Sequence, residues 1–372
     1  MARAHTIPQS VTSVEKPLLA PWRGPLFVIG MWRSGTSLLY ALLNKHPQIG
    51  LMYEGDLFLL RSLFWIPRTA SSWLVRWELW NGAPKRHGLD TSRISSTVSR
   101  LQPAIKESYQ AYARQKEALV WGDKSVNCYD CLTRLARSFP DARFIIIWRD
   151  PAAICRSVIR AAEEPCWFDR RGMTSLALLG YKVLKTECDR LVSRGTRVHQ
   201  MHYEALVKDP PGAMADVCTF LGLPFVPSVG SLEGADRSAI YEEKHHWLVK
   251  SERIVSSPDS SQILPAYLKR KIERYVSLWR AESGDMWPFL SSPQNSDSGK
   301  PSLRERLVDR AAYHWLRGFD FIVALVYCFA PFWLLRGIQA ARARTNLHSP
   351  RGVFPRLVQC IVAWYLGKRR PW

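Results

Sequence analysis

The chain lacks a long uninterrupted apolar segment, and this limits how it can meet a membrane. Residues 1–22 hold no run of seven or more apolar residues, so they predict a disordered leader and no signal peptide or signal anchor. Residues 321–335 are apolar for 15 residues, whereas a spanning helix needs about 20. Because Pro331 lies inside this run and Asp320 and Arg336 flank it, we expect an interfacial or re-entrant element.

Cysteines and acidic residues are also scarce. Eight cysteines scattered over 372 residues do not form a disulfide framework, so reduced thiols and a cytoplasmic setting are expected. Cys128 and Cys131 form a CxxC pair without a second pair nearby, which favours a partly buried helix face over a metal site. The 52 basic against 32 acidic residues give a net charge of +20. This balance predicts a polyanionic partner: a multiply phosphorylated ligand, nucleic acid or an anionic membrane.

Short apolar runs alternate with helical patterns in the first three quarters of the chain. Pro25–Gly30 and Arg143–Trp148 have the pattern of buried parallel strands, and Arg197–Met201 that of a weaker third strand. Apolar spacing predicts helices at 37–45, 96–116, 152–162, 174–194, 211–221 and 265–281. This alternation predicts an α/β fold with a P-loop-type central parallel sheet flanked by helices.

A change of composition divides the chain. The polar stretch at 291–302 predicts a linker between a catalytic domain at 23–290 and a helical tail at 303–372. Tryptophans and arginines in the tail favour peripheral association with a membrane, and the alternative is a helix packed on the domain.

The sharpest motif is Gly30-Met-Trp-Arg-Ser-Gly35-Thr36-Ser37, which follows one predicted strand and opens a helix. Backbone N–H groups of such a loop, together with the helix N-terminus, bind phosphate. A nucleoside-triphosphatase loop needs lysine where Thr36 stands, and here the positive charge lies inside the loop at Arg33. The loop therefore suits a 5′-phosphate, with chemistry other than triphosphate hydrolysis.

A second anion site is expected after the strand at Arg143–Trp148. Arg149 directly follows that strand, and Ser157 lies eight residues further on, about two turns into the next helix. Ligands of open α/β sheets bind at the carboxyl ends of the strands. The two sites together predict one ligand with two separated phosphate ends.

At these residues the chain resembles sulfotransferases that use 3′-phosphoadenosine-5′-phosphosulfate (PAPS). It is most similar to the branch with arginine in the loop, which includes tyrosylprotein and bacterial carbohydrate-type enzymes. Four stretches carry the resemblance, in order: GMWRSGTSLLYALLNKHP (Gly30–Pro47), GDKS (Gly122–Ser125), RDPAAICRSVIR (Arg149–Arg160) and YEALVKDP…FLGLPF (Tyr203–Phe225).

The resemblance implies a donor site. The 5′-phosphosulfate would be held by Arg33, Ser34, Gly35, Thr36 and Ser37. Arg149 and Ser157 would hold the 3′-phosphate, and Tyr203 would approach the adenosine.

The resemblance also implies the catalytic groups. Arg33 would act on the leaving bridge oxygen, and Lys124 would lie beside the sulfuryl group. Glu54 follows Arg33 by 21 positions, as the general base does in the tyrosylprotein branch, and Asp56 is the rival. No metal is needed.

The expected function is transfer of a sulfuryl group from PAPS to a hydroxyl of a carbohydrate, lipid-linked or peptide acceptor. A tryptophan stripe at 73, 77 and 80 is a candidate acceptor wall, although such stripes are more often core. His245, His246 and Lys250 are weaker candidates, and a structural role is favoured for the histidines. The alternatives are a P-loop nucleotide-binding kinase and a non-catalytic membrane-surface protein; no nucleic-acid-binding motif is present.

Overall fold

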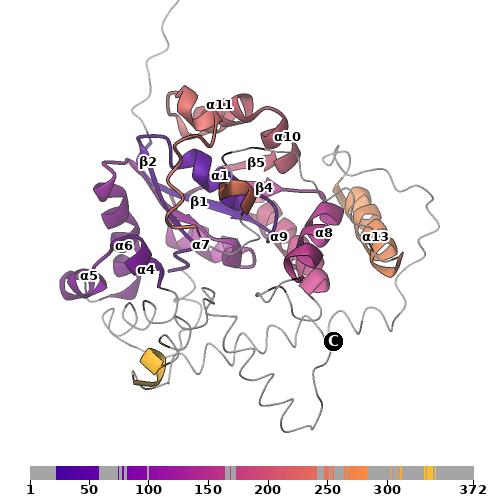
Figure 1. Cartoon of the computed structure of the whole chain (residues 1–372), viewed down its shortest axis with the longest axis horizontal. Helices are drawn as coiled ribbons and strands as arrows, with labels where there is room; N and C mark the ends of the chain where they lie inside the picture. The colour runs from indigo at the N-terminus through magenta and orange to yellow at the C-terminus, as the bar shows by residue number, and fades with distance from the viewer. Residues whose placement is uncertain are drawn as a thin grey trace, which may run out of the picture.

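Five parallel strands form the central sheet of the protein (Figure 1). The computed structural model describes residues 22–57, 82–98, 100–163, 173–240, 247–250 and 266–283, with short pieces elsewhere. The strands run in the order β2-β3-β1-β4-β5. Their bounds are β1 Pro25–Gly30, β2 Ile49–Tyr53, β3 Val120–Lys124, β4 Arg143–Trp148 and β5 Val198–His202. The predicted fold class is confirmed.

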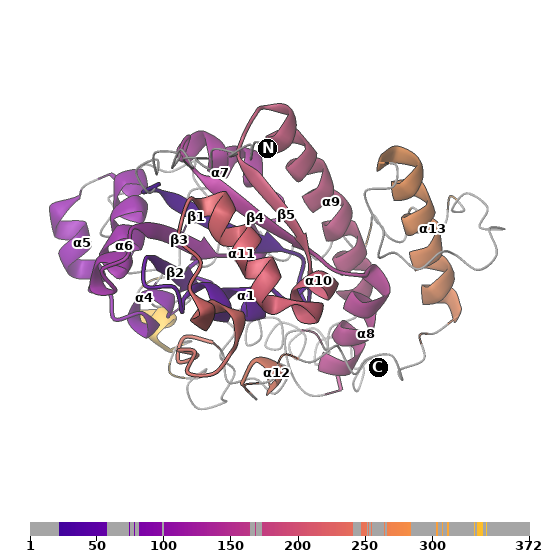
Figure 2. The same ribbon diagram turned by 90° about the horizontal axis from the view of Figure 1, so that it is seen from above.

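Helices cover both faces of the sheet (Figure 2). Leu26 and Val28 of β1 pack with α1 (Thr36–Leu43), α10 (Tyr203–Lys208) and α11 (Pro210–Leu221). Phe27 and Ile29 point to the opposite face. The helices on that face are α6 (Leu101–Gln115), α7 (Leu132–Ser138), α8 (Pro151–Ala161) and α9 (Met173–Ser193). Because both faces are covered, β1 and β4 are apolar at nearly every position, which made them visible in the sequence.

Shorter elements complete the described part of the chain. They are α4 (Ala83–Arg86), α5 (Thr91–Thr97), η1 (Val126–Cys128), η3 (Pro227–Gly230) and α12 (Trp247–Lys250). The helix α13 (Ala266–Ser283) packs against the outer side of α8.

The predicted single helix at 96–116 is wrong at its start. Residues 96 and 97 end α5, and α6 begins only at Leu101, because Val98 and Arg100 have extended backbones. Proline is tolerated in the first turn of a helix but clashes with the preceding turn in its interior. The break therefore puts Pro103 in the first turn of α6.

Several predictions fall on residues that the structure does not describe. These are residues 1–21, the linker 291–302, most of the tail, and Trp73, Trp77, Trp80, His245 and His246. In the tail, the described residues 333–337 are helical, with Leu335 buried in the core and Trp333 exposed. No helix within the described ranges is long and apolar enough to cross a bilayer.

Candidate active site

The carboxyl ends of the parallel strands bring the predicted site residues to one edge of the sheet. The loop of Arg33 follows β1, Glu54 follows β2 and Lys124 is the last residue of β3. Arg149 follows β4 and Tyr203 follows β5. Positions up to 170 residues apart in the sequence therefore meet where open α/β sheets bind their ligands.

The loop after β1 has the backbone of a phosphate cradle. Arg33 has φ 70° and Gly35 has φ 95°, so the chain turns sharply before α1. A Cβ atom on Gly35 would lie 2.3 Å from Cδ2 of Tyr203, so only glycine fits there. The hydroxyl of Ser34 is buried and has no hydrogen-bond partner within the described residues. The first turn of α1, which begins at Thr36, adds backbone N–H groups that lack intrahelical partners.

The two predicted anion sites touch each other. Nε of Arg33 donates to Oγ of Ser157 at 2.9 Å. Nη1 of Arg149 donates to the carbonyl oxygen of Arg33 at 2.6 Å, and the Arg149 guanidinium lies 4.3 Å from the centre of the Tyr203 ring. Two cationic side chains, Ser157 and an aromatic ring thus face one location, which suits a ligand with more than one phosphate.

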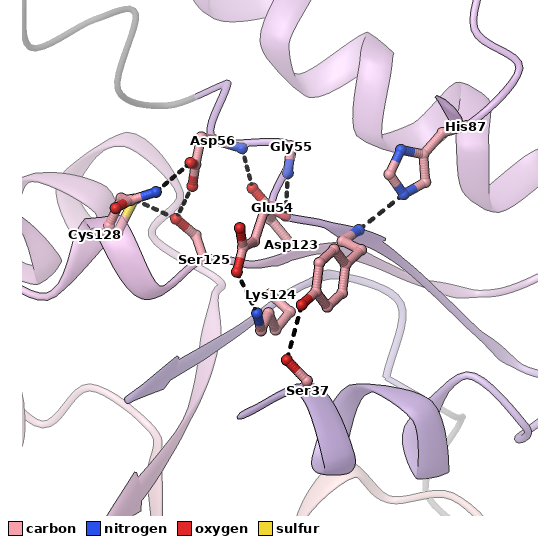
Figure 3. Close-up of polar contacts among 11 residues, drawn as sticks. Ser37, Glu54, Gly55, Asp56, His87, Asp123, Lys124, Ser125 and Cys128 are labelled. Carbon is pink, nitrogen blue, oxygen red and sulfur yellow. Dashed lines mark hydrogen bonds and ion pairs between the residues drawn. The ribbon is translucent and has the colours of Figure 1, made fainter. Parts of the chain in front are cut away.

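On the other side of the loop, Glu54 and Lys124 form an ion pair (Figure 3). Nζ of Lys124 lies 2.6 Å from Oε1 of Glu54, and the side chains are 1% and 15% exposed. The same ammonium lies 4.0 Å from the centre of the Tyr53 ring. The Tyr53 hydroxyl is 2.8 Å from Oγ of Ser37, which links the base candidate to the cradle.

The rival base Asp56 is already engaged. Its carboxylate accepts hydrogen bonds from Oγ of Ser125 and from Nδ2 of Asn127, and the residue is buried. Glu54 is the more exposed of the two acids, so the geometry favours it as the group that meets an acceptor. Its catalytic role stays a prediction.

His87 fixes the end of β2 from the side of α4. Its Nε2 accepts the backbone N–H of Tyr53 at 2.9 Å, and its Nδ1 donates to the carbonyl oxygen of Ala83 at 2.7 Å. The ring is therefore neutral with its proton on Nδ1. Burial lowers the pKa of His87 from 6.5 to about 4.

We expect acidification to destabilise the protein through His87. Because the folded state disfavours the charged ring, its stabilising effect is complete above the unfolded pKa of 6.5 and is lost as the pH falls through about 4. Between pH 7 and pH 5 this amounts to about 2 kcal/mol. Urea unfolding of the wild type and of His87→Gln at both pH values checks the effect. An equal pH dependence in the two proteins would contradict it.

The sequence did not reveal Asp123, Tyr53 and His87 as parts of this site. Asp123 lies inside the GDKS stretch, but the resemblance implied a role only for its neighbour Lys124. Tyr53 and His87 belong to no motif, and their contacts depend on the packing of α4 beside β2.

The CxxC pair lies between two short helices: Cys128 ends η1, and Cys131 is the residue before α7. Cys128 and Cys131 are both buried, and the described residues contain no group of three or more metal-ligating side chains. The pKa of Cys128 is raised well above its usual value by a hydrogen bond with Cys131 and by burial, which makes the thiol unreactive.

A parallel sheet with a glycine-containing loop after its middle strand and arginines at the same edge defines an α/β phosphate-loop protein. A sequence profile described as "Sulfotransferase family" matches residues 25–227, more than half of the chain. The chain belongs to the sulfotransferase family.

The chain is similar to curated proteins named as protein-tyrosine sulfotransferases. It is 26% identical to protein-tyrosine sulfotransferase 1 of Danio rerio over 207 residues, which cover 55% of this chain and 54% of the relative. It is 24% identical to protein-tyrosine sulfotransferase 2 of Gallus gallus over 221 residues, with 58% and 54% covered. The chain thus spans about half the length of these relatives.

Solved structures of low sequence identity share the fold. The sulfotransferase domain from the curacin biosynthetic pathway is 21% identical with a TM-score of 0.51, covering 70% of this chain and 98% of that domain. The sulfotransferase domain from the Synechococcus PCC 7002 olefin synthase gives the same identity and TM-score, with 70% and 96% covered.

Proposed function

We propose that the protein is a PAPS-dependent sulfotransferase that moves a sulfuryl group onto a hydroxyl of its acceptor. One observation carries the proposal: the Arg33 side chain donates to Ser157, and the Arg33 carbonyl oxygen accepts from Arg149. The Lys124–Glu54 pair lies at the same edge of the sheet. Membership of the sulfotransferase family supports it.

The residues present fit a donor with a 5′-phosphosulfate and a 3′-phosphate. The buried Ser34 hydroxyl lacks a partner among the described residues, and Gly35 lets the loop turn directly against the Tyr203 ring. Arg33 and the N-terminus of α1 would hold the 5′ end, while Arg149 and Ser157 would hold the 3′-phosphate. Tyr203, stacked on Arg149, would border the adenosine.

The chain's own groups fit the needs of sulfuryl transfer. PAPS supplies the sulfuryl group, and adenosine 3′,5′-bisphosphate is released. Glu54 would take the proton of the acceptor hydroxyl, which is a poor nucleophile until it loses that proton. Arg33 and Lys124 would neutralise the negative charge that develops during transfer. Lys124 already contacts Glu54, so the cation and the base candidate are placed together before any ligand binds.

A transfer assay tests the function directly. PAPS labelled with 35S is incubated with the protein and with glycans, lipids and tyrosine-containing peptides; the peptides are included because the curated relatives carry protein-tyrosine sulfotransferase names. Label should appear on one hydroxyl class. Tighter binding of ATP than of adenosine 3′,5′-bisphosphate, measured by calorimetry, would instead favour a P-loop kinase. Membrane contact by residues 303–372 stays a separate proposal, which sedimentation with anionic vesicles can refute.

Arg149→Ala should remove selectivity for the 3′-phosphate. We expect the affinity for adenosine 3′,5′-bisphosphate to fall about 10- to 100-fold, the value of a lost charge-assisted hydrogen bond. Adenosine 5′-monophosphate lacks the 3′-phosphate, so its affinity should change less than about threefold. Calorimetric titration of both nucleotides measures the difference. Equal losses for the two would show that Arg149 supports the loop and does not read the 3′-phosphate.

A further inference from the structure

The turn that carries Glu54 is unusual in its backbone. Glu54 has φ 47° and Asp56 has φ 51°, so two non-glycine residues with left-handed backbones flank Gly55. Such a conformation costs about 1–2 kcal/mol for each residue that has a Cβ atom. Backbone strain of this kind is found where the surroundings hold it in place.

The carboxylate of Asp123 holds this turn. Its Oδ1 accepts the backbone N–H of Gly55 at 3.0 Å, and its Oδ2 accepts that of Asp56 at 2.7 Å (Figure 3). The Tyr109 hydroxyl donates to Oδ2 at 3.1 Å and so fixes the carboxylate from α6. Asp123 is 1% exposed, which makes these hydrogen bonds strong and their loss costly.

Two neighbouring residues of β3, Asp123 and Lys124, therefore both bind the turn Glu54–Asp56. Side chains of consecutive strand residues point to opposite faces. Asp123 binds the backbone that follows Glu54, while the Lys124 carbonyl accepts the Glu54 N–H at 2.9 Å and the Lys124 ammonium binds its carboxylate. The position of the Glu54 carboxylate is set by β3 through both contacts.

We propose that Asp123 is a positioning residue for the reaction, acting through Glu54 by holding the turn Glu54–Asp56 against the end of β3. The inference rests on the proposed function. It assigns no direct contact between Asp123 and either substrate.

Asp123 is buried away from solvent, which fits a positioning role without direct contact with a substrate. Burial and the neighbouring Asp56 carboxylate raise the pKa of Asp123 above its usual value, while the donors from Gly55, Asp56 and Tyr109 act in the opposite direction. Both oxygens face N–H or O–H donors, so the geometry favours the ionised form, which accepts all three.

Asp123→Asn is the sharpest variant because it preserves shape. An amide has one acceptor oxygen and one NH₂ group, so in either orientation it turns a donor toward one of the two backbone N–H groups. We expect kcat to fall about 100-fold, as a small displacement of a catalytic group can cause. The Kd for adenosine 3′,5′-bisphosphate should stay within about threefold, because the donor cradle is untouched.

A double-mutant comparison separates positioning from general damage. In a Glu54→Gln background, Asp123→Asn should lower kcat by less than about threefold, since the group it positions is already gone. An equal loss in both backgrounds would overturn the proposal. The matched control is Glu187→Gln: Glu187 is another buried carboxylate, which accepts the Thr133 N–H at 2.9 Å, and its variant should keep wild-type kcat.

Hydrogen exchange provides a readout that does not depend on activity. The amides of Gly55 and Asp56 should lose protection in Asp123→Asn and keep it in Glu187→Gln; unchanged protection would overturn the proposal. If Asp123→Asn does not fold, Tyr109→Phe removes only the third donor and should lower kcat about threefold at unchanged Kd; no loss would count against the proposal. A wild-type chain that transfers no sulfuryl group would instead refute the proposed function, and the role of Asp123 in catalysis with it.

Discussion

Replacing Glu54 by glutamine should lower kcat by about 10²–10⁴-fold, the usual contribution of a general base. The variant keeps an oxygen that can accept from the buried Lys124 ammonium, so the fold and the affinity for adenosine 3′,5′-bisphosphate should be retained. Alanine would be a poorer choice, because it leaves a buried charge without its carboxylate partner. Steady-state kinetics with labelled PAPS gives kcat, and calorimetry gives the affinity.

Glu117 offers a matched control for this substitution. It is also a glutamate with a left-handed backbone, at φ 53°, but it is exposed and lies in the turn between α6 and β3. Glu117→Gln should leave kcat unchanged. Asp56→Asn serves as the second comparison. If Asp56→Asn loses turnover while Glu54→Gln retains it, Asp56 is the base and the assignment to Glu54 is wrong.

The sheet was only partly predictable from the sequence. The runs at β1 and β4 are apolar at nearly every position because helices cover both faces, and they were predicted within their true bounds. The third prediction was one residue early, since β5 is Val198–His202. The strands β2 and β3 were missed. β3 reads VWGDK. Because its polar end belongs to the site, the run lacks the apolar pattern that predicts a buried strand.

Gly122 shows why the polar end of β3 still forms a strand. Its φ is 144°, and a Cβ atom there would lie 2.0 Å from the carbonyl oxygen of Leu26 on β1. Only glycine allows β3 to pair so closely with β1 at this point. In the sequence this glycine looked like part of a motif, whereas in the fold it also sets the position of Asp123 and Lys124.

The site was predictable as a set of residues but not as an arrangement. Arg33 and Ser157 were assigned to opposite ends of one ligand, yet they are joined by a hydrogen bond across 124 positions of sequence. Their contact follows from the pairing of β1 with β4, in which Gly30 lies beside Ile147. No local pattern in the sequence encodes that register. The same holds for Asp123, which accepts from two backbone N–H groups of another strand's loop and from Tyr109 of α6.

We expect Arg33 to lower the stability of the fold through its left-handed backbone while its charge raises kcat. Two substitutions can separate these effects. Its φ of 70° costs an arginine or an alanine about 1–2 kcal/mol but costs glycine almost nothing. Arg33→Gly should therefore remain within about 1 kcal/mol of wild type in urea unfolding, despite losing the bond to Ser157, and should be more stable than Arg33→Ala.

Both Arg33 variants should lower kcat about 10²–10³-fold, because each loses a cation that stabilises the charge developing in transfer. Arg114→Ala, which removes an exposed arginine paired with Glu107, should change neither property by much. The decisive comparison is between the stability measured by urea unfolding and the kcat of each variant. If Arg33→Gly kept wild-type turnover, the loop cation would have no part in transfer. If it unfolded as readily as Arg33→Ala, the left-handed backbone at position 33 would carry no strain, and the arginine would be there for the fold.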